Sequence, residues 1–445
     1  MTVTLGTRGT AWSPETRLYS DGVVIGADGG PLVVPPHSGL RRLPGTGYLD
    51  PSSGELPGAA VPTSDDVDAA RAALAAAELP GRGTPYAAMA EHALVDIGVL
   101  TFPNGAVVAA GSPYWRYVWP RDAGYMAAAL VLAGQPDLAF SQLSYVAAMQ
   151  ESDGTWQARY LPDGTRAVPD DRGLQLDGIG WTLWASWVLA SSAGGTPSGR
   201  ERLAELAPMI RAAVTAALDA LDPRTALPKA SQDFWEMDVE EAVLGSAAPL
   251  LLGLRSGRDL LRRLGSDGTG VGLSEDGVLS EDGVLSERAA DAATRLADAV
   301  RSGFGAHGYA RRISGSGGRD ASIAFLLPPF APHDAEVEQA WRAAVADTTV
   351  ANGGVRPGEE WTDLETAWTP QMSLHAMTAA SIGDAALAHR LLSWLDLRRS
   401  RLGALPEKVT AAGRPAAVAP LGLTGATVLI ALAALDGRAL PVPLP

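Results

Sequence analysis

Glu236 is the side chain in this sequence whose surroundings best suit proton transfer. It directly follows Trp235, in a loop ahead of an expected helix. A carboxyl group beside a large indole is partly desolvated, so its neutral form is favoured and its pKa should rise. Such a group can hold a proton near neutral pH and donate it to a leaving oxygen. An acid next to a tryptophan is also common on protein surfaces, so the interpretation depends on the residues that accompany Glu236.

The acids that follow Glu236 have a structural explanation. Asp238 is followed three residues later by Glu241 and then by the apolar run 242–252, which is the pattern of a capping box. This pattern predicts a helix over 239–253 with Asp238 as its cap. Glu236 then remains outside the helix and available for chemistry.

The segment 112–122 suits the binding of a sugar. Arg121 and Asp122 stand together at an expected helix start. Aromatic faces pack against the apolar C–H faces of a pyranose, and an arginine with an aspartate donates to and accepts from adjacent hydroxyls. Alternatively, Arg121 and Asp122 form a structural ion pair beneath aromatic core residues. The aromatic side chains ahead of this pair are Tyr114, Trp115, Tyr117 and Trp119.

Two further loops carry polar residues of the same kind. Asp177 lies in the run 175–181, before another expected buried helix, where it either binds substrate or serves in turn and capping chemistry. Arg356 lies in the Gly-rich loop 353–361. It either reaches sugar hydroxyls or pairs with Glu359 or Glu360 as a solvated loop charge.

Glu407 is a second isolated carboxylate, in a loop bounded by glycine and proline before the last expected helix. A lone loop glutamate is usually without function, and Lys408 is a simple partner for it. It matters here because hydrolysis of a glycosidic bond needs two carboxyl groups, one protonated and one ionised.

Composition restricts the class of protein. The chain has 445 residues, of which 47% are hydrophobic and 19% charged, so it can bury a large core as one or two domains. Its net charge of -15 argues against nucleic acid or an anionic membrane as partner. The absence of cysteine excludes disulfides and thiolate zinc sites, and the six histidines show no metal-ligand spacing. We therefore expect no metal and no cofactor.

The sequence contains no run of eighteen apolar residues, and its first residues do not form a basic stretch followed by an apolar one. These features predict a cytoplasmic protein.

The elements that must position these residues are mostly helical. Residues 1–62 are rich in Gly, Pro and Ser with short apolar pieces, which predicts a small β-rich cap ahead of a helical domain over 63–445. Several helices are Ala- and Leu-rich nearly all round, which indicates burial on several sides. This alternation of helices and loops fits helical hairpins closed into a ring, with a site in the loops at one end. The direct repeat over 274–285 is interpreted as an exposed insertion. The expected helices cover 64–79, 86–97, 122–134, 136–150, 178–192, 199–221, 239–253, 287–303, 319–327, 333–347, 363–380, 383–396 and 423–435.

Five motifs together resemble glycoside hydrolase family 15, the glucoamylases and their bacterial relatives. Any one of them is modest, but their order and spacing over residues 85–435 are specific. The motifs are Trp115-x-Tyr117-x-Trp119-x-Arg121-Asp122, Gln175-Leu176-Asp177-Gly178, Asp233-Phe234-Trp235-Glu236, Gly354-x-Arg356 with Trp361 and Trp368, and Leu405-Pro406-Glu407-Lys408.

The resemblance implies an all-α fold, an (α/α)6 barrel with a short β-rich N-terminal extension. It also implies an inverting, exo-acting hydrolase that removes β-glucose from the non-reducing end of small α-gluco-oligosaccharides such as maltose or isomaltose. Glu236 matches the family's general acid and Glu407 its general base, whose carboxyl groups stand about 6.5–9.5 Å apart in inverting enzymes. The residues matched to substrate binding are Arg121, Asp122, Trp119, Tyr117, Trp115, Asp177, Trp235, Arg356 and Trp368.

Departures from the family pattern bear on the substrate. Residues 420–426 replace an aromatic-rich segment, and Asp171-Arg172-Gly173 occupies the place where some relatives have an aromatic residue beyond the cleavage point. These differences favour a small di- or oligosaccharide over starch granules. Two alternatives remain: a trehalase or phosphorylase on the same barrel, and a non-catalytic sugar-binding protein. No Gly-rich or clustered Lys/Arg loop was identified as the phosphate pocket that a phosphorylase needs.

Overall fold

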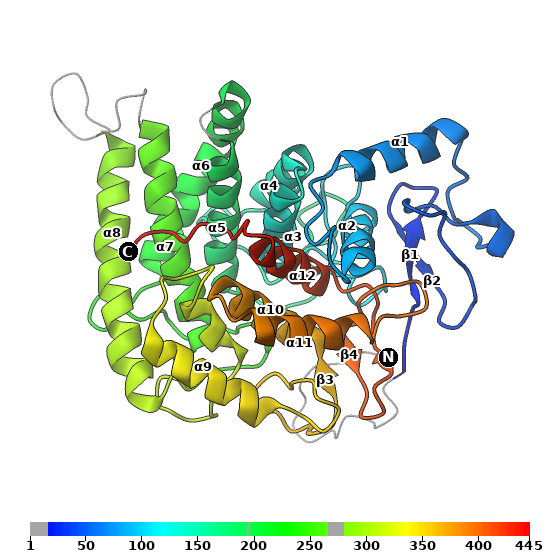
Figure 1. Ribbon diagram of the computed structural model, residues 1–445. Coiled ribbons are helices and arrows are strands. Elements are labelled where there is room, and N and C mark those ends of the chain that lie inside the picture. The colour runs from blue at the N-terminus through cyan, green and yellow to red at the C-terminus, as the bar shows by residue number, and fades with distance from the viewer. Residues whose placement is uncertain (1–16, 194–195, 266–279) are drawn as a thin grey trace.

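The computed structural model describes residues 17–193, 196–265 and 280–445, and most of them form helices that alternate between an inner and an outer ring (Figure 1). Consecutive inner elements pack on one another, and the ring closes because α12 packs against α3. The inner ring consists of α3 (Pro120–Leu132), α5 (Asp177–Ser192), α7 (Leu244–Gly265), the short 3-10 helix η4 (Ala321–Leu326), α10 (Thr369–Ser381) and α12 (Gly422–Leu435). The outer ring consists of α2 (Ala87–Leu100), α4 (Pro136–Ala148), α6 (Pro197–Asp219), α8 (Glu281–Ala299), α9 (Ala335–Thr348) and α11 (Ala385–Asp396).

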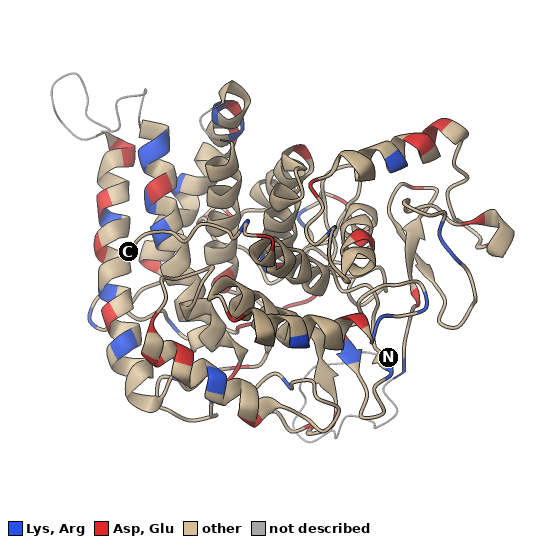
Figure 2. Ribbon diagram, viewed as in Figure 1, with Lys and Arg blue, Asp and Glu red and all other residues tan. Residues whose placement is uncertain are grey.

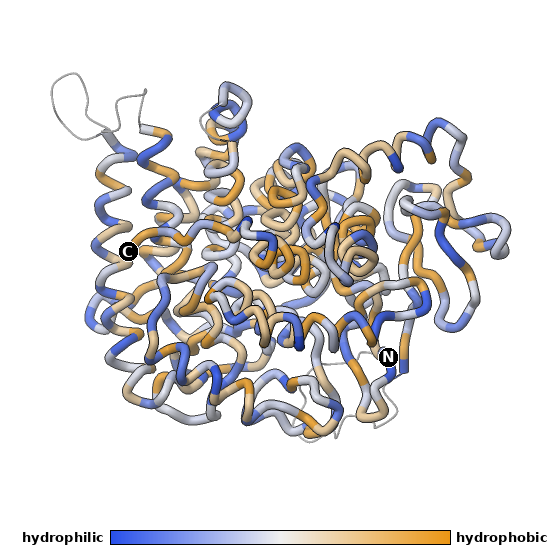
Figure 3. The backbone as a smooth tube through the Cα atoms, viewed as in Figure 1, coloured by the Kyte–Doolittle hydropathy of each residue, from blue (hydrophilic) through white to orange (hydrophobic). Residues whose placement is uncertain are grey.

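This arrangement is the predicted (α/α)6 barrel. Inner helices such as α3 and α12 are buried around almost their whole circumference, as their Ala- and Leu-rich sequences predict. Outer helices such as α8 and α9 carry many charged residues, and so does the C-terminal half of the inner helix α7 (Figure 2). Figure 3 shows the same contrast, because hydrophobic residues follow α12 continuously but alternate with polar ones along α8.

The helix predicted over 239–253 begins five residues later, at Leu244, and Asp238 does not cap it. Asp238 accepts a hydrogen bond from Gln232 Nε2 at 2.8 Å, and the Glu241 carboxylate accepts two from Ser314. Val243 also forms an isolated antiparallel bridge with Arg312. Residues 239–243 are therefore held non-helical by partners that are distant in sequence, which a local capping pattern cannot anticipate.

The repeat over 274–285 is divided by the structure. Residues 274–279 lie outside the described residues, whereas the second copy starts α8. Ser280 caps this helix by accepting from Gly283 N, and the buried Asp282 pairs with Arg211 at 2.6 Å. The interpretation as an exposed insertion is thus wrong for 280–285, because Ser280, Glu281 and Asp282 form the N-terminus of a helix of the barrel.

The N-terminal extension packs on the barrel. Strands β1 (Gly22–Ile25) and β2 (Pro31–Val34) form an antiparallel hairpin, on the side of the molecule opposite α8 (Figure 1). The short 3-10 helix η1 (Pro51–Ser53) and α1 (Ser64–Ala76) follow, and Thr63 rather than Ser64 caps α1 in a capping box with Asp66. Leu402, from the barrel, completes a small apolar cluster with Val24 and Val34. The domain division at residue 62 stays a prediction.

A second small sheet lies in the barrel loops. It consists of β3 (Ala367–Trp368), β4 (Lys408–Val409) and β5 (Pro415–Ala416), all antiparallel. In the part of the chain that the structure describes, we find no helix long and apolar enough to cross a membrane.

Candidate active site

The predicted site residues gather at one end of the barrel. Each outer helix returns the chain, so the inner segments run in the same direction and their N-terminal ends lie together. The loops that lead into these ends carry all the predicted residues. They are Trp115, Tyr117 and Trp119 before α3, Arg121 and Asp122 in its first turn, Asp177 at the start of α5, Trp235 and Glu236 before α7, Arg356 and Trp368 before α10, and Glu407 before α12.

The Glu236 carboxyl group is fixed by donors from two loops. The indole Nε1 of Trp119 donates to Glu236 Oε1 at 2.9 Å, and Gln175 Nε2 donates to the same oxygen at 3.5 Å. The backbone of Glu236 is in the left-handed region, with φ of +52°. Such strain in a non-glycine residue costs about 1–3 kcal/mol and is found preferentially at functional sites. The loop therefore orients the Glu236 side chain while its backbone stays in a strained conformation.

The other oxygen of Glu236 meets an arginine. Arg172 Nη1 contacts Glu236 Oε2 in an ion pair, while Arg172 Nε donates to Asp170 at 3.0 Å. Asp170 also pairs with Arg159, whose guanidinium stacks over the ring of Trp119 at 5.0 Å. Burial lowers the pKa of Arg172, and the nearby charge of Arg159 lowers it further. The ion pair and the indole donor both favour the ionised carboxylate. This is opposite to the effect expected from the neighbouring indole of Trp235.

A buried network holds the loop that carries Glu236. Arg311 is fully buried, pairs with Asp233 at 3.0 Å and lies 3.6 Å from Asp320. Its guanidinium stacks over Trp235 at 4.4 Å, and Trp235 Nε1 donates to Asp320 Oδ2 at 2.9 Å. Burial raises the pKa of Asp320 to about 6, and the charge of Asp233 acts in the same direction. Breaking a buried pair of this kind typically costs about 3–5 kcal/mol, so the network fixes Trp235 firmly.

Arg121 is aligned by a second buried cluster. Its Nη1 donates to Asp177 Oδ2 at 2.9 Å and to Gln175 Oε1 at 3.2 Å, and its Nε lies 3.6 Å from Asp122. Trp181 Nε1 donates to the same oxygen of Asp177. Burial raises the pKa of Asp122 to about 6, although Arg121 opposes the shift. Asp177 Oδ2 thus accepts from both Arg121 and Trp181, while its Oδ1 is buried without a hydrogen-bond partner among the described residues.

Three tryptophans connect the two halves of the site. The rings of Trp235 and Trp361 meet edge to face with centroids 5.1 Å apart, and Trp361 meets Trp368 in the same way at 5.2 Å. Lys408 Nζ lies 4.1 Å from the centre of the Trp368 ring. Trp368 also pairs with Lys408 in the register of β3 and β4. The residue next to Glu236 is thus linked through aromatic contacts to the residue next to Glu407.

Glu407 is buried, with an exposed fraction of 5%. Burial raises the pKa of Glu407, while Lys408 and a hydrogen bond from Trp115 lower it. Glu407 Oε2 has no hydrogen-bond partner among the described residues. A buried carboxylate oxygen without a partner is costly unless it receives a proton donor, and a water molecule or a hydroxyl can be that donor.

Arg356 forms neither of its alternative ion pairs. Its Nη2 donates to the carbonyl of Asp347 at 3.2 Å, while Glu359 pairs with Arg319 and Glu360 with Arg312. The prediction that Arg356 pairs with Glu359 or Glu360 is therefore wrong. Its role in sugar binding stays a prediction.

Several residues of the site escaped the sequence interpretation. The sequence presents Gln175 as an amide suited to a sugar rather than as a partner of Glu236, and Arg172 only as a replacement for an aromatic residue. The sequence did not point to Arg311 or Asp320. The two residues are nine positions apart, and no local pattern indicates that they meet in the core. No group of three or more histidine or acidic side chains within 17–193, 196–265 and 280–445 is placed to hold a metal ion.

Comparison with known proteins identifies this arrangement. The family model described as "Glycosyl hydrolases family 15" matches residues 87–346. An uncharacterized glycosyl hydrolase of Methanocaldococcus jannaschii is 34% identical over 97 residues, which are 21% of this chain. The matched part is only 15% of that relative's length.

Solved structures share the fold. A glycosidase variant superposes with a TM-score of 0.62 at 22% identity, covering 79% of this chain and 96% of that one. A bacterial glucoamylase complexed with acarbose has a TM-score of 0.65 at 14% identity, covering 85% of this chain and 60% of that one. The glucoamylase of Saccharomycopsis fibuligera gives 0.61 at 11% identity, covering 78% and 93%. At these identities the likeness concerns the fold.

Proposed function

The chain belongs to family 15 of the glycosyl hydrolases, and from this premise we propose that it hydrolyses α-glucosides with inversion. In this proposal it acts from the non-reducing end of small α-gluco-oligosaccharides and releases β-glucose. One observation carries the proposal. Trp119 Nε1 donates to Glu236 Oε1 at 2.9 Å, and Trp115, four residues earlier in the same loop, lies close enough to Glu407 to lower its pKa. A single segment thereby contacts two carboxyl groups that lie 171 positions apart in the sequence.

Glu236 is proposed as the general acid, which protonates the glycosidic oxygen as the bond from that oxygen to the anomeric carbon breaks. Trp119 and Gln175 hold Oε1, so the proton has to reside on Oε2. That oxygen pairs with Arg172 in this structure. We infer that the sugar displaces Arg172 from Glu236 when it binds, because a carboxylate paired with a guanidinium does not keep a proton.

Glu407 is proposed as the general base. Its unpartnered Oε2 is suited to accept a proton from water, whose oxygen then attacks the anomeric carbon from the face opposite Glu236. The leaving sugar takes the proton of Glu236, and the released glucose has the β configuration. Inversion requires about 6.5–9.5 Å between the two carboxyl groups to accommodate this water.

The terminal glucose is proposed to lie between Trp119 and Trp368, with Arg121 and Asp122 bonded to its hydroxyls. Asp177 supports this contact by fixing Arg121. Tyr117, Trp115, Trp235 and Arg356 complete the proposed binding set. The acarbose complex of the related bacterial glucoamylase is consistent with a glucoside substrate. The segment Asp171-Arg172-Gly173, where some relatives have an aromatic residue, favours a short substrate.

The test is glucose release from maltose, isomaltose, trehalose, kojibiose, nigerose and longer maltooligosaccharides. Glu407→Gln serves as the inactive control. Activity on trehalose alone would assign the chain to the trehalases, and strict dependence on phosphate with release of glucose 1-phosphate would assign it to the phosphorylases. Sugar binding without turnover on the whole panel would overturn the proposal in favour of a binding protein.

A further inference from the structure

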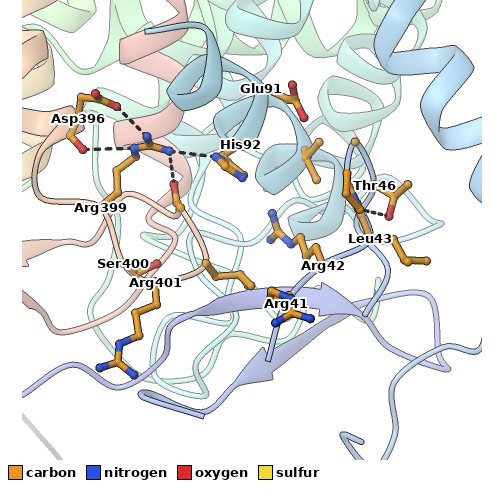
Figure 4. Close-up of a pocket in the computed structure, with 15 residues that line it drawn as sticks. Arg41, Arg42, Leu43, Thr46, Glu91, His92, Asp396, Arg399, Ser400 and Arg401 are labelled. Atoms are coloured by element: carbon orange, nitrogen blue, oxygen red, sulfur yellow. Dashed lines mark hydrogen bonds and ion pairs between the residues drawn. The ribbon is translucent and has the colours of Figure 1, made fainter. Parts of the chain in front are cut away.

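A cavity of about 560 Å³ lies between the N-terminal extension and the barrel (Figure 4). The extension contributes residues 41–46, and the barrel contributes three residues of α2 together with Asp396 and residues 399–403 after α11. None of these residues belongs to the candidate active site. The volume of the cavity is typical of sites for small molecules, which measure about 300–1,000 Å³.

The charge of this cavity contrasts with that of the chain. Four arginines and two acids line it, whereas the whole chain carries a net charge of -15. The charges of two arginines are neutralised by ion pairs. Arg399 pairs with Asp396 at 2.9 Å, and Arg42 pairs with Asp96, which lies outside the lining. Arg41 is 65% exposed with one ion pair at 3.5 Å, a geometry worth little in water. Arg401 is exposed and has no ion pair with another described residue. Against these last two stands the remaining lining acid, Glu91, so the cavity keeps a small positive surplus.

The interior of the cavity offers a buried donor without a partner. Arg42 is 7% exposed and donates to the carbonyl of Val23 at 2.8 Å, and its Nη2 pairs with Asp96. Its Nη1 is buried and has no hydrogen-bond partner in the part of the chain that the structure describes. A guanidinium keeps its proton at any ordinary pH, so a buried Nη1 without an acceptor is a standing cost, and Arg42 adds positive charge to the wall of the cavity.

His92 is fixed as a second donor. Arg399 Nη1 lies 3.0 Å from His92 Nδ1, and because arginine has only donors, Nδ1 must accept and Nε2 must carry the proton. Burial lowers the pKa of His92, and the charges of Arg42 and Arg399 lower it further against the opposing charge of Asp96. Figure 4 shows Arg399 between Asp396 and His92, with Arg41 and Arg42 on the segment across from it.

We propose that this cavity, the basic pocket, binds a small phosphorylated metabolite of mononucleotide size. The phosphoryl group would be bound by Arg42 and His92 with Arg41 and Arg401 at the opening, since arginine matches the geometry of phosphate oxygens. The apolar wall formed by Leu43, Pro44, Val95 and Leu402 suits the organic part of such a ligand.

The basic pocket adjoins the loop that carries Glu407. Arg399 Nη1 contacts the carbonyl of Gly403 at 3.5 Å, and Ser400 bonds to the backbone of Asp21 in the extension. Gly403 packs so closely on His92 that an added Cβ would stand 2.6 Å from the imidazole. Gly403 is four residues from Glu407. A bound ligand would therefore hold the base of this loop, and on the basis of the proposed function it would act as an effector of hydrolysis.

Binding is tested by calorimetry with AMP, inorganic phosphate and adenosine on the full chain. The double variant Arg41→Ala/Arg401→Ala removes the two exposed arginines, so folding should be unaffected, as a melting curve would verify. Arg288→Ala, an exposed arginine on α8, removes the same kind of charge elsewhere. We expect AMP to bind more tightly than phosphate, adenosine not to bind, and the double variant to lose about 10-fold or more in affinity while Arg288→Ala loses none.

Failure of both AMP and phosphate to bind, or equal affinity in all three proteins, would overturn the proposal. Because binding is measured without turnover, this result is independent of whether the chain hydrolyses glucosides. If AMP binds but leaves kcat for glucose release unchanged in an active enzyme, the effector role is refuted and the binding site stands.

Discussion

The indole Nε1 of Trp119 donates to Oε1 of Glu236 at 2.9 Å, although 117 residues separate them in sequence. Trp119 immediately precedes α3 and Glu236 lies in the loop before α7, so the contact joins two different inner segments of the barrel. It occupies one carboxyl oxygen and leaves the other for Arg172 or a substrate. The division of roles between the two oxygens leads to the first predictions.

Glu236→Gln should lower kcat by about 10²-fold or more while KM changes little, because the amide keeps the contact with Trp119 but cannot supply a proton. The measurement is steady-state glucose release on the preferred disaccharide. Asp238→Asn is the matched control, since Asp238 lies two residues away, is exposed, and among the described residues accepts its side-chain hydrogen bond from Gln232. A Glu236→Gln enzyme as active as Asp238→Asn would remove Glu236 from the mechanism.

Arg172→Ala should move the basic limb of the pH–kcat/KM profile to higher pH. A nearby cation stabilises the ionised form of a carboxyl group, so without Arg172 the proton of Glu236 is retained to higher pH. Arg172→Lys keeps the positive charge and should restore part of the original position. A basic limb that is identical in wild type and Arg172→Ala would show that this ion pair does not govern the acid.

Glu407 should set the acidic limb of the same profile. Burial raises the pKa of Glu407, and a general base works only when ionised, so kcat/KM should fall as pH decreases through a value above that of an ordinary glutamic acid. Lys408→Met removes the nearby charge that opposes the shift, and the acidic limb should move to still higher pH. An acidic limb at or below the ordinary glutamate value would contradict this assignment.

The stability of the fold should depend on the neutral form of His375. Trp341 Nε1 donates to His375 Nδ1 at 3.0 Å, and burial lowers the pKa of His375 to about 4. The unfolded chain binds this proton near its ordinary pKa of about 6.5, so native stability is lost as pH falls through that value towards about 4. Between about pH 7.5 and 5 the wild type should lose about 2 kcal/mol more than His375→Gln.

Urea unfolding of the two proteins at each pH measures this difference. Asp122 and Asp320, whose pKa values are raised, act with the opposite sign, but they are present in both proteins and cancel in the comparison. Parallel pH dependences of wild type and His375→Gln would show that His375 does not titrate in this range.

The (α/α)6 barrel could be predicted from the resemblance of the five motifs to the family, and the apolar circumference of several helices agreed with it. Residues 422–435, for example, are apolar nearly all round, which predicts burial on several sides, and the structure buries most of them. The sequence also predicted that the site lies at one end of the barrel, because the motif residues lie in loops that precede successive helices. Boundaries failed where long-range partners intervene, as at Glu241, whose carboxylate binds Ser314 instead of capping a helix.

The supporting residues could not be predicted in the same way. Arg311 lies between Asp233 and Asp320 because the fold brings three loops together, and no local pattern marks that meeting. Arg172 interrupts the expected desolvation of Glu236, an effect that depends on how the loop 170–172 folds over the carboxyl group. Sequence identified the residues that do the proposed chemistry, and structure was needed for those that tune it.

Inversion is the central claim, and NMR of the first product formed tests it most directly. The enzyme is mixed with its preferred disaccharide, and the anomeric proton signals of released glucose are followed before mutarotation equilibrates them. The account predicts β-glucose first, because water activated by Glu407 attacks opposite the bond that Glu236 protonates. Initial release of α-glucose would contradict the arrangement of one acid, one base and an intervening water.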